Sequence, residues 1–180
     1  DENYKLYGIN IDSTNAIAYT EFDGVRTQII DGLPDIPNEV IIGLNKRNPQ
    51  VFDPYRLNLE TGEMEMLAEN PGNIQGWMFD HDGKLRIALA IVDGVNVSLL
   101  YRETEADEWE SVLTTSFKDN LSPEFFTFDN KNVIATSNLN RDKSAVVEFD
   151  IANGKEIKLL YENENYDVSS VGYSEKRKVI

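Results

Sequence analysis

Apolar and polar residues alternate along most of the chain, in short runs that end at glycine, asparagine or aspartate. In residues 63–67, for example, Met64 and Met66 fall on one face of an extended strand and Glu63 and Glu65 on the other. A period of two, bounded by such turn residues, is typical of β-hairpins. No segment sustains a period of 3.6, so we expect an all-β fold with low helix content.

One short phrase of sequence recurs. Each copy is an apolar residue, an amide or acid, and a second apolar residue, with a turn signal within four residues. The copies are Ile9-Asn10-Ile11, Leu57-Asn58-Leu59 and Phe149-Asp150-Ile151. Their spacings are 48 and 92 residues, and 92 is two periods of 46. A period of roughly 40–50 residues made of strands is typical of propeller blades.

The repeat predicts a partial β-propeller of about four blade units, each of four antiparallel strands. The units are expected at residues 4–44, 55–90, 97–138 and 145–180, and the whole of residues 1–180 is expected to be one propeller-like fragment. The expected strands are Leu6–Ile11, Ala16–Thr20, Thr27–Ile30, Glu39–Leu44, Tyr55–Leu59, Glu63–Leu67, Ile74–Phe79, Leu85–Ala90, Val97–Tyr101, Trp109–Thr114, Phe125–Phe128, Val133–Ser137, Val146–Ile151, Glu156–Leu160 and Val168–Tyr173. The last unit is expected to be incomplete, with the chain ending partway through its fourth strand, as in a piece of a longer protein.

Composition narrows the classes of partner. The net charge of −15, from 32 acidic and 17 basic residues, repels phosphate backbones and anionic membranes, so we expect neither nucleic acid nor membrane as a partner. Apolar stretches such as Val40–Leu44 are far too short to span a bilayer. The absence of cysteine excludes a disulfide framework, a thiolate zinc site and a cysteine nucleophile.

The one histidine, His81, lies in a predicted turn, Asp80-His81-Asp82-Gly83, where we expect it to be solvated. The chain has no Gly-x-Ser-x-Gly nucleophile elbow, so a Ser–His–Asp triad cannot be completed within it. The Asp80-x-Asp82-Gly83 spacing resembles half of a calcium loop. The further oxygen ligands and the closing glutamate are missing, which favours a plain hairpin turn.

The remaining candidates also point away from a site. The acidic runs Glu103–Glu110 and Glu162–Asp167 are interpreted as solvated loops or edges. The 32 acidic residues allow many pairs of carboxylates, so a pair suited to glycoside hydrolysis stays an open alternative. Gly72–Gly76 lacks the lysine and helix of a phosphate-binding loop. We therefore predict no catalytic, cofactor-binding or metal residue and no cofactor. The aromatic residues expected in the core are Trp77, Phe79, Trp109, Phe125, Phe126, Phe128, Phe149 and Tyr173.

Three segments carry a resemblance to a known family. They are Glu39–Pro49, with its Gly-Leu-Asn-x-Arg-x-Pro phrase, Asp53–Glu63 and Ala68–Trp77. They resemble the N-terminal β-propeller of bacterial prolyl oligopeptidase-like (S9) serine peptidases of the dipeptidyl aminopeptidase or acylaminoacyl-peptidase type. The resemblance extends over most of the chain.

The resemblance implies a function for the whole protein. In that family the propeller caps an α/β-hydrolase domain that carries the Ser-Asp-His triad, and it admits only short peptides. The expected partners are thus a C-terminal α/β-hydrolase domain of the same polypeptide and short peptides, in a soluble protein of the bacterial cytoplasm or periplasm. No triad residue and no acid that binds a substrate amino terminus can be carried over to a position of this chain.

Two other interpretations stay open. The chain fits a WD40- or TolB-like propeller that serves as a protein-interaction module, and it also fits a four-bladed domain that closes on itself. A Gly-x-Ser-x-Gly motif elsewhere in the parent gene would separate the peptidase from the interaction module.

Overall fold

A computed structural model describes residues 3–174 and 176–180. Within these ranges the chain forms strands and turns and no helix, so it contains no helix long and apolar enough for a membrane span. The strands are β1 (Tyr7–Gly8), β2 (Ile17–Ala18), β3 (Thr27–Asp31), β4 (Glu39–Leu44), β5 (Asp53–Asn58), β6 (Met64–Met66), β7 (Ile74–Phe79), β8 (Leu85–Val92), β9 (Asn96–Tyr101), β10 (Glu110–Thr115), β11 (Leu121–Phe126), β12 (Val133–Ser137), β13 (Ala145–Asp150) and β14 (Lys155–Tyr161).

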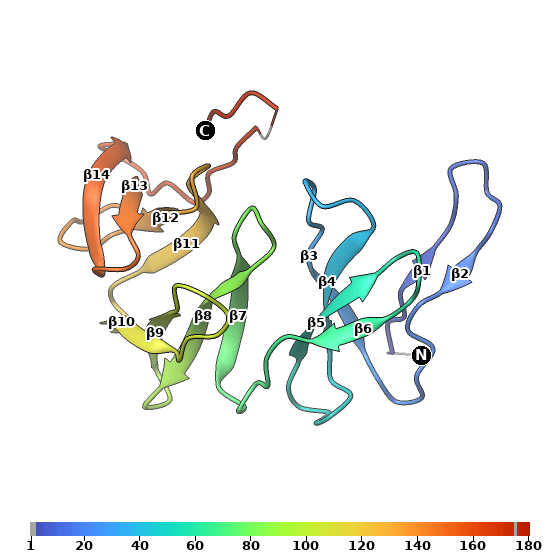
Figure 1. Cartoon of the computed structure of the whole chain (residues 1–180). Coiled ribbons are helices and arrows are strands. Elements are labelled where there is room, and N and C mark those ends of the chain that lie inside the picture. The colour runs from blue at the N-terminus through green and yellow to red at the C-terminus, as the bar shows by residue number, and fades with distance from the viewer. Residues whose placement is uncertain (1–2, 175) are drawn as a thin grey trace. The chain divides into compact units, whose positions relative to one another are not determined.

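Consecutive strands pair into antiparallel sheets (Figure 1). Three sheets have four strands each, in the orders β3-β4-β5-β6, β7-β8-β9-β10 and β11-β12-β13-β14, and β1 pairs with β2 alone. The first strands of the three complete sheets begin at Thr27, Ile74 and Leu121, which are 47 residues apart. The all-β fold and the blade-like repeat that the sequence predicts are thus confirmed.

The grouping of strands into units differs from the prediction. The predicted unit 55–90 joins β5 and β6 to β7 and β8, whereas β5 and β6 complete the sheet that β3 begins, and β7 and β8 start the next one. The predicted units 4–44, 97–138 and 145–180 are out of step by two strands in the same way. Alternation identifies each hairpin, but it carries no information on which successive hairpins share a sheet.

The recurring phrase marks one position in the repeat. Leu57-Asn58-Leu59 lies at the end of the third strand of its sheet, β5, where the turn to β6 begins, and Phe149-Asp150-Ile151 lies at the same place in β13, before β14. Ile9-Asn10-Ile11 follows β1 in the hairpin to β2. By this correspondence β1 and β2 are equivalent to the third and fourth strands of a sheet.

The predicted strand Val168–Tyr173 is wrong, because these residues belong to none of the strands in the structure. A single bridge instead joins Ser174 to Val179, with a Ser174 N–H to Val179 carbonyl distance of 2.8 Å. The first hairpin of the preceding sheet closes in the same way, from Thr127 N–H to the Asn132 carbonyl at 2.8 Å. The final turn therefore corresponds to the turn between the first and second strands of a sheet.

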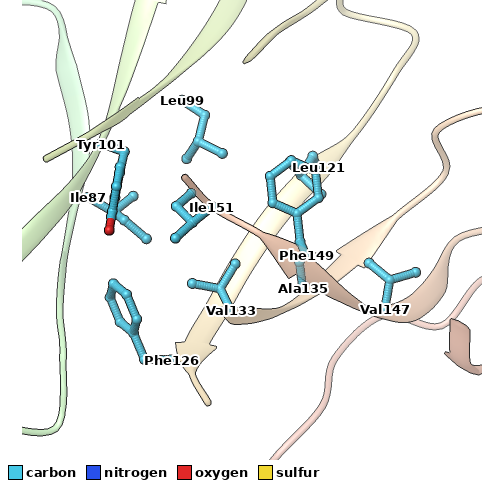
Figure 2. Packing of buried hydrophobic residues seen from close by; sticks show 10 residues of the cluster. All are labelled: Ile87, Leu99, Tyr101, Leu121, Phe126, Val133, Ala135, Val147, Phe149 and Ile151. Carbon is cyan, nitrogen blue, oxygen red and sulfur yellow. The ribbon is translucent and has the colours of Figure 1, made fainter. Parts of the chain in front are cut away.

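The chain divides into two compact units, Asp1–Asn73 and Ile74–Ile180. In the second unit, two sheets pack face to face, and Figure 2 shows Ile87, Leu99 and Tyr101 of one sheet directed toward Phe149 and Ile151 of the other. In the first unit a smaller cluster forms on one face of the sheet β3–β6. Its members are Val25, Val40, Ile42, Leu44 and Leu57, with Leu6 and Tyr19 of the β1–β2 hairpin packed against it.

The aromatic residues divide between the core and the surface. Phe79, Phe125, Phe126 and Phe149 are buried, as predicted. The other four expected core residues are only partly buried or exposed: Trp77, Trp109, Phe128 and Tyr173. The last three also lie outside strands, in connections between them.

Candidate functional site

A buried arginine, Arg86 of β8, organises the polar groups at one end of the second unit. Its side chain is 7% exposed. Nη2 donates to the Tyr101 hydroxyl at 2.5 Å and to the Glu103 carboxylate at 3.0 Å, and Nη1 donates to the Asn130 carbonyl at 2.7 Å. The guanidinium carbon also lies 5.2 Å from the ring centre of Phe126. Arg86 thus joins its own sheet to the turn between β11 and β12.

The Tyr101 hydroxyl is a proton donor in this cluster and not a base. Burial, together with the hydrogen bond to Glu103, raises the pKa of Tyr101 to about 12. The hydroxyl therefore stays protonated through the neutral range, and it donates to the Glu103 carboxylate while it accepts from Arg86. These hydrogen bonds hold the loop after β9 against β8 within one sheet, and they occupy the Tyr101 hydroxyl as both donor and acceptor.

Asp80 acts within the turn that it opens. One carboxylate oxygen accepts the backbone N–H groups of Asp82 at 3.0 Å and Lys84 at 2.8 Å, and the other lies 3.5 Å from Arg86 Nη1. The Asp80–Gly83 segment, considered above as half of a calcium loop, is therefore built as a hairpin turn. In the described parts of the chain, no three side chains of the types that ligate metals come together.

His81 is not simply solvated, and that expectation is wrong. Its Nε2 lies 3.0 Å from the Phe126 carbonyl oxygen. Its ring stacks on Phe128 at 5.6 Å between centres and meets the edge of Tyr173 at 5.7 Å. His81, in the first turn of the sheet β7–β10, thus packs against the corresponding turn of the sheet β11–β14. The two acids that flank it contact other groups: Asp80 accepts backbone N–H groups of its own turn, and Asp82 accepts from the Asn130 side chain.

Asn130 was not singled out by the sequence beyond its place in an ordinary turn. Its side-chain oxygen accepts the His81 backbone N–H at 3.0 Å, and its side-chain nitrogen donates to Asp82 at 3.0 Å. Its own backbone has a φ of +58°, a conformation in which asparagine is favoured over most residues. The equivalent residue of the preceding turn is Gly83, with a φ of +71°. A glycine and an asparagine at equivalent positions of two repeats indicate a positive φ there, so aligning the repeats could have identified this turn position.

The acidic runs are loops, as predicted, but several of their acids have defined partners. Glu103 accepts from Arg86, and Glu105 accepts the Leu85 backbone N–H at 3.2 Å. In the second run, Asp167 accepts the Ser144 backbone N–H at 2.8 Å. These carboxylates fix loops against the sheets.

In the first unit, the segment with the Gly-Leu-Asn-x-Arg-x-Pro phrase forms a second polar cluster. Arg47 makes two parallel hydrogen bonds to Asp53, both of 3.0 Å, and donates to the Asn70 carbonyl at 2.6 Å. Asp53 is fully buried and also accepts the Asn70 backbone N–H at 2.7 Å. The hydrogen bond to Asp53 raises the pKa of Arg47. This cluster, here called the Arg47 clasp, ties the β4–β5 loop to the segment after β6.

The first unit also has an open groove of about 410 Å³ between the β1–β2 hairpin and the sheet β3–β6. It is lined mainly by apolar side chains from both sides, among them Tyr7, Ile9, Ile17, Ile29, Val40 and Leu59. Asn10, Asn15 and Glu39 add polar groups at its wall. The volume lies within the range of small-ligand sites, roughly 300–1,000 Å³. Sequence reasoning did not predict this groove, because it depends on how the β1–β2 hairpin lies beside the sheet β3–β6.

Comparison with solved structures defines the class of fold. The structure is similar to TolB from Acinetobacter baumannii, with a TM-score of 0.60, 18% identity, and coverage of 88% of this chain and 38% of that one. It is also similar to an oligogalacturonate lyase from Vibrio parahaemolyticus, with a TM-score of 0.51 and 13% identity over 86% of this chain and 46% of that one. The sheets are thus blades of a TolB-like propeller fold.

Comparison of sequences gives the relatives. The chain is 29% identical over 170 residues to dipeptidyl aminopeptidase BIII of Pseudoxanthomonas mexicana, which is 93% of this chain and 24% of that protein. It is 28% identical over 148 residues to dipeptidyl peptidase family member 6 of Caenorhabditis elegans, which is 73% of this chain and 20% of that protein. No family model matches the chain. The chain is therefore a propeller segment distantly related to dipeptidyl peptidases, and it spans about a quarter or less of the length of these relatives.

Proposed function

We propose that this chain is the non-catalytic propeller part of an S9-type serine peptidase, and that it limits access of substrates to an α/β-hydrolase domain of the same polypeptide. The observation that carries the proposal is the match of 93% of this chain to only 24% of dipeptidyl aminopeptidase BIII. The rest of such a protein has room for a hydrolase domain. Proteolysis of short peptides would then belong to the whole polypeptide, with substrate and hydrolase domain as the partners of this part.

The polar clusters support a scaffold role. The hydrogen bond from Arg86 to the Asn130 carbonyl connects neighbouring sheets, and the Arg47 clasp connects the β4–β5 loop to the segment after β6, so buried charge is used to hold sheets and loops in place. Four-stranded antiparallel sheets packed on one another by apolar faces form a rigid body. A rigid body beside an active site restricts substrates by size, since a folded protein cannot enter a passage between such sheets.

The test uses the parent polypeptide and a series of substrates that share one cleavable amino-terminal dipeptide. The series runs from the dipeptide linked to a chromogenic amide, through unstructured peptides of increasing length, to a folded protein with the same amino terminus. We expect cleavage of the short substrates, with kcat/KM falling at least a hundredfold for the folded protein. The 180-residue chain alone is the control and is expected to cleave none of them.

The outcomes separate the proposal from its alternative. Equal cleavage of short peptides and folded protein would remove the gating role. A parent gene without a Gly-x-Ser-x-Gly segment, or a parent polypeptide with no peptidase activity, would leave the protein-interaction module as the better interpretation.

A further inference from the structure

The turn between β13 and β14 contains the one asparagine–glycine pair of the sequence, Asn153–Gly154. Asn153 is exposed to solvent, and Gly154 has a φ of +64°. The side-chain amide of an asparagine can be attacked by the backbone nitrogen of the residue that follows it. A following glycine leaves that nitrogen most accessible, because it has no Cβ. The pair is therefore a candidate for a covalent reaction within the turn.

The backbone nitrogen of Gly154 is available as the nucleophile. In the equivalent turn of the first complete sheet, the Gly62 N–H donates to the Asn58 carbonyl at 2.8 Å. For the Gly154 N–H, the residues that the structure describes supply no such hydrogen bond. The residue equivalent to Asn153 is Thr61, which has no side-chain amide. Of these two turns, the later one thus combines a free nitrogen with an amide beside it.

The Asp150 carboxylate restrains the side chain of Asn153. Its Oδ1 and Oδ2 accept from Asn153 Nδ2 at 3.1 and 2.9 Å, and Oδ1 also accepts the Asn153 backbone N–H at 3.1 Å. Nδ2 is the atom that must leave in the reaction. A carboxylate that accepts from it stabilises the intact amide, and its charge opposes the negative charge that develops on the amide oxygen during attack. Asp150 is therefore placed to slow the reaction.

We propose that Asn153 converts to aspartate and isoaspartate without an enzyme, and that Asp150 sets the rate of this conversion. The Gly154 nitrogen gives its proton to hydroxide and forms a bond to Cγ of Asn153. The bond between Cγ and Nδ2 breaks, and Nδ2 takes a proton from water and leaves as ammonia. Water then opens the resulting succinimide ring at either of its two carbonyls. In sum, one water is consumed and one ammonia is released.

Both products weaken the turn. Each replaces the amide that donates to Asp150 by a second carboxylate beside it, so an attraction becomes a repulsion between like charges. Isoaspartate also adds a carbon to the backbone next to Gly154, where a Cβ would lie 2.5 Å from the Val112 carbonyl oxygen. This contact between the turn and β10 leaves little room for a longer backbone. The modification thus loosens the turn from the neighbouring sheet.

The polypeptide that carries this chain is incubated at pH 7 and at pH 8.5, and peptide mapping by mass spectrometry follows the conversion of each asparagine. Asn165 is the internal control, because it is exposed in a loop and followed by a tyrosine. The variant Asp150→Asn introduces the residue type that the equivalent position 58 already has. Asp119→Asn is its matched control, since Asp119 is an exposed turn acid that accepts from the Ser116 hydroxyl at 2.8 Å. Amide hydrogen exchange of β13 and β14 is measured in parallel.

We expect Asn153 to convert at least about tenfold faster than Asn165, because glycine leaves the attacking nitrogen unshielded. The rate should be higher at pH 8.5, where hydroxide is more abundant. In Asp150→Asn the rate at Asn153 should rise at least about threefold, with the rate at Asn165 and the exchange of both strands unchanged. Asp119→Asn should change neither rate. These readouts do not depend on peptidase activity, so failure of the proposed function leaves this inference standing.

Four results would overturn the inference or one of its parts. Equal rates at Asn153 and Asn165 would remove the site. Aspartate as the sole product would exclude the succinimide, since direct hydrolysis of the amide gives no isoaspartate. An unchanged rate in Asp150→Asn would remove the role of Asp150. A rate in that variant that rises together with hydrogen exchange across β13 and β14 would assign the restraint to the fold as a whole and not to this carboxylate.

Discussion

Several arginines in the chain are held by carboxylates from a neighbouring strand or loop. Arg47 pairs with Asp53, Arg86 with Glu103, and Arg141 makes two hydrogen bonds to Glu156, of 3.1 and 2.6 Å. The partners are 6, 17 and 15 residues apart in sequence, and strand pairing and loop conformation bring them together. Part of the negative charge of this chain is thus carried by acids with specific cationic partners.

The Arg47 clasp offers a comparison of two acids that face one cation. Asp53→Asn replaces a fully buried carboxylate that accepts from Arg47 and from the Asn70 backbone, and we expect the free energy of unfolding to fall by about 1–3 kcal/mol. Glu69 lies 3.2 Å from the same guanidinium but is 62% exposed, so Glu69→Gln should cause no measurable change. Urea unfolding of both variants checks this, and equal losses would contradict it.

Tyr101 gives a pH dependence with a defined sign. Its folded-state pKa of about 12 exceeds the unfolded value of about 10, so the folded chain binds more protons between these values. The contribution of Tyr101 to stability is complete below pH 10 and is lost as the pH rises toward 12. Tyr101→Phe should remove about 2 kcal/mol of the fall in stability over this interval.

Urea unfolding of wild type and Tyr101→Phe at pH 8, 10 and 11.5 provides the measurement, because the other titrating groups are the same in both proteins. Tyr161→Phe, which makes the same change on an exposed tyrosine of β14, is the control. Parallel pH profiles for wild type and Tyr101→Phe would show that the hydroxyl is not protected by the fold.

At the scale of elements, the hairpins were predictable and their grouping was not. Glu39–Leu44, Ile74–Phe79 and Val133–Ser137 have the same bounds in sequence and structure, because alternation and flanking turn residues define them. The strand β11 begins four residues before its predicted start, since Pro123 interrupts the pattern; as a first strand at the sheet edge, β11 tolerates a proline. Which hairpins share a sheet depends on packing between strands, and the sequence of a single hairpin does not indicate it.

Two equivalent turns differ in how closely the next sheet approaches. Gly62 and Gly154 both have positive φ, +75° and +64°, after third strands of their sheets. A Cβ at Gly62 meets nothing within 4 Å, whereas a Cβ at Gly154 would lie 2.5 Å from the Val112 carbonyl oxygen. We expect Gly62→Ala to cost about 1 kcal/mol of backbone strain, and Gly154→Ala to cost at least about 1–2 kcal/mol more.

The unfolding free energies of the two glycine variants, measured under the same conditions, decide this prediction. Val112 belongs to β10, so a large excess cost at Gly154 would report on the packing of the sheet β7–β10 against the turn between β13 and β14. Equal costs would mean that the turn moves aside without resistance.

At the scale of the whole molecule, the sequence indicated the fold and the relatives, while the polar clusters and the groove needed coordinates. The period of 46–47 residues was visible because Leu67, Leu113 and Leu160 repeat it. The hydrogen bonds of His81 to Asn130 and to the Phe126 carbonyl join two sheets, at sequence separations of 49 and 45 residues. No pattern within one repeat predicts such contacts.

The net charge of −15 leads to a prediction for the parent polypeptide that rests on the proposed function. A strongly acidic body raises the local concentration of cationic solutes at low ionic strength. Peptide substrates that differ only by added lysine or added glutamate should therefore differ in kcat/KM at about 10 mM salt, in favour of lysine. The two values should converge above about 0.5 M salt, where screening is short-ranged. Equal values at low salt would count against electrostatic steering by this domain.

The uninterrupted order of strands within each sheet has a consequence for synthesis. Every complete sheet uses about 40 consecutive residues, and each strand pairs with the one made just before it. Such local pairing favours fast folding, since few long loops must close. Each sheet is able to form on the ribosome while the next is still being translated, and a nascent chain would gain its structure in steps of one repeat.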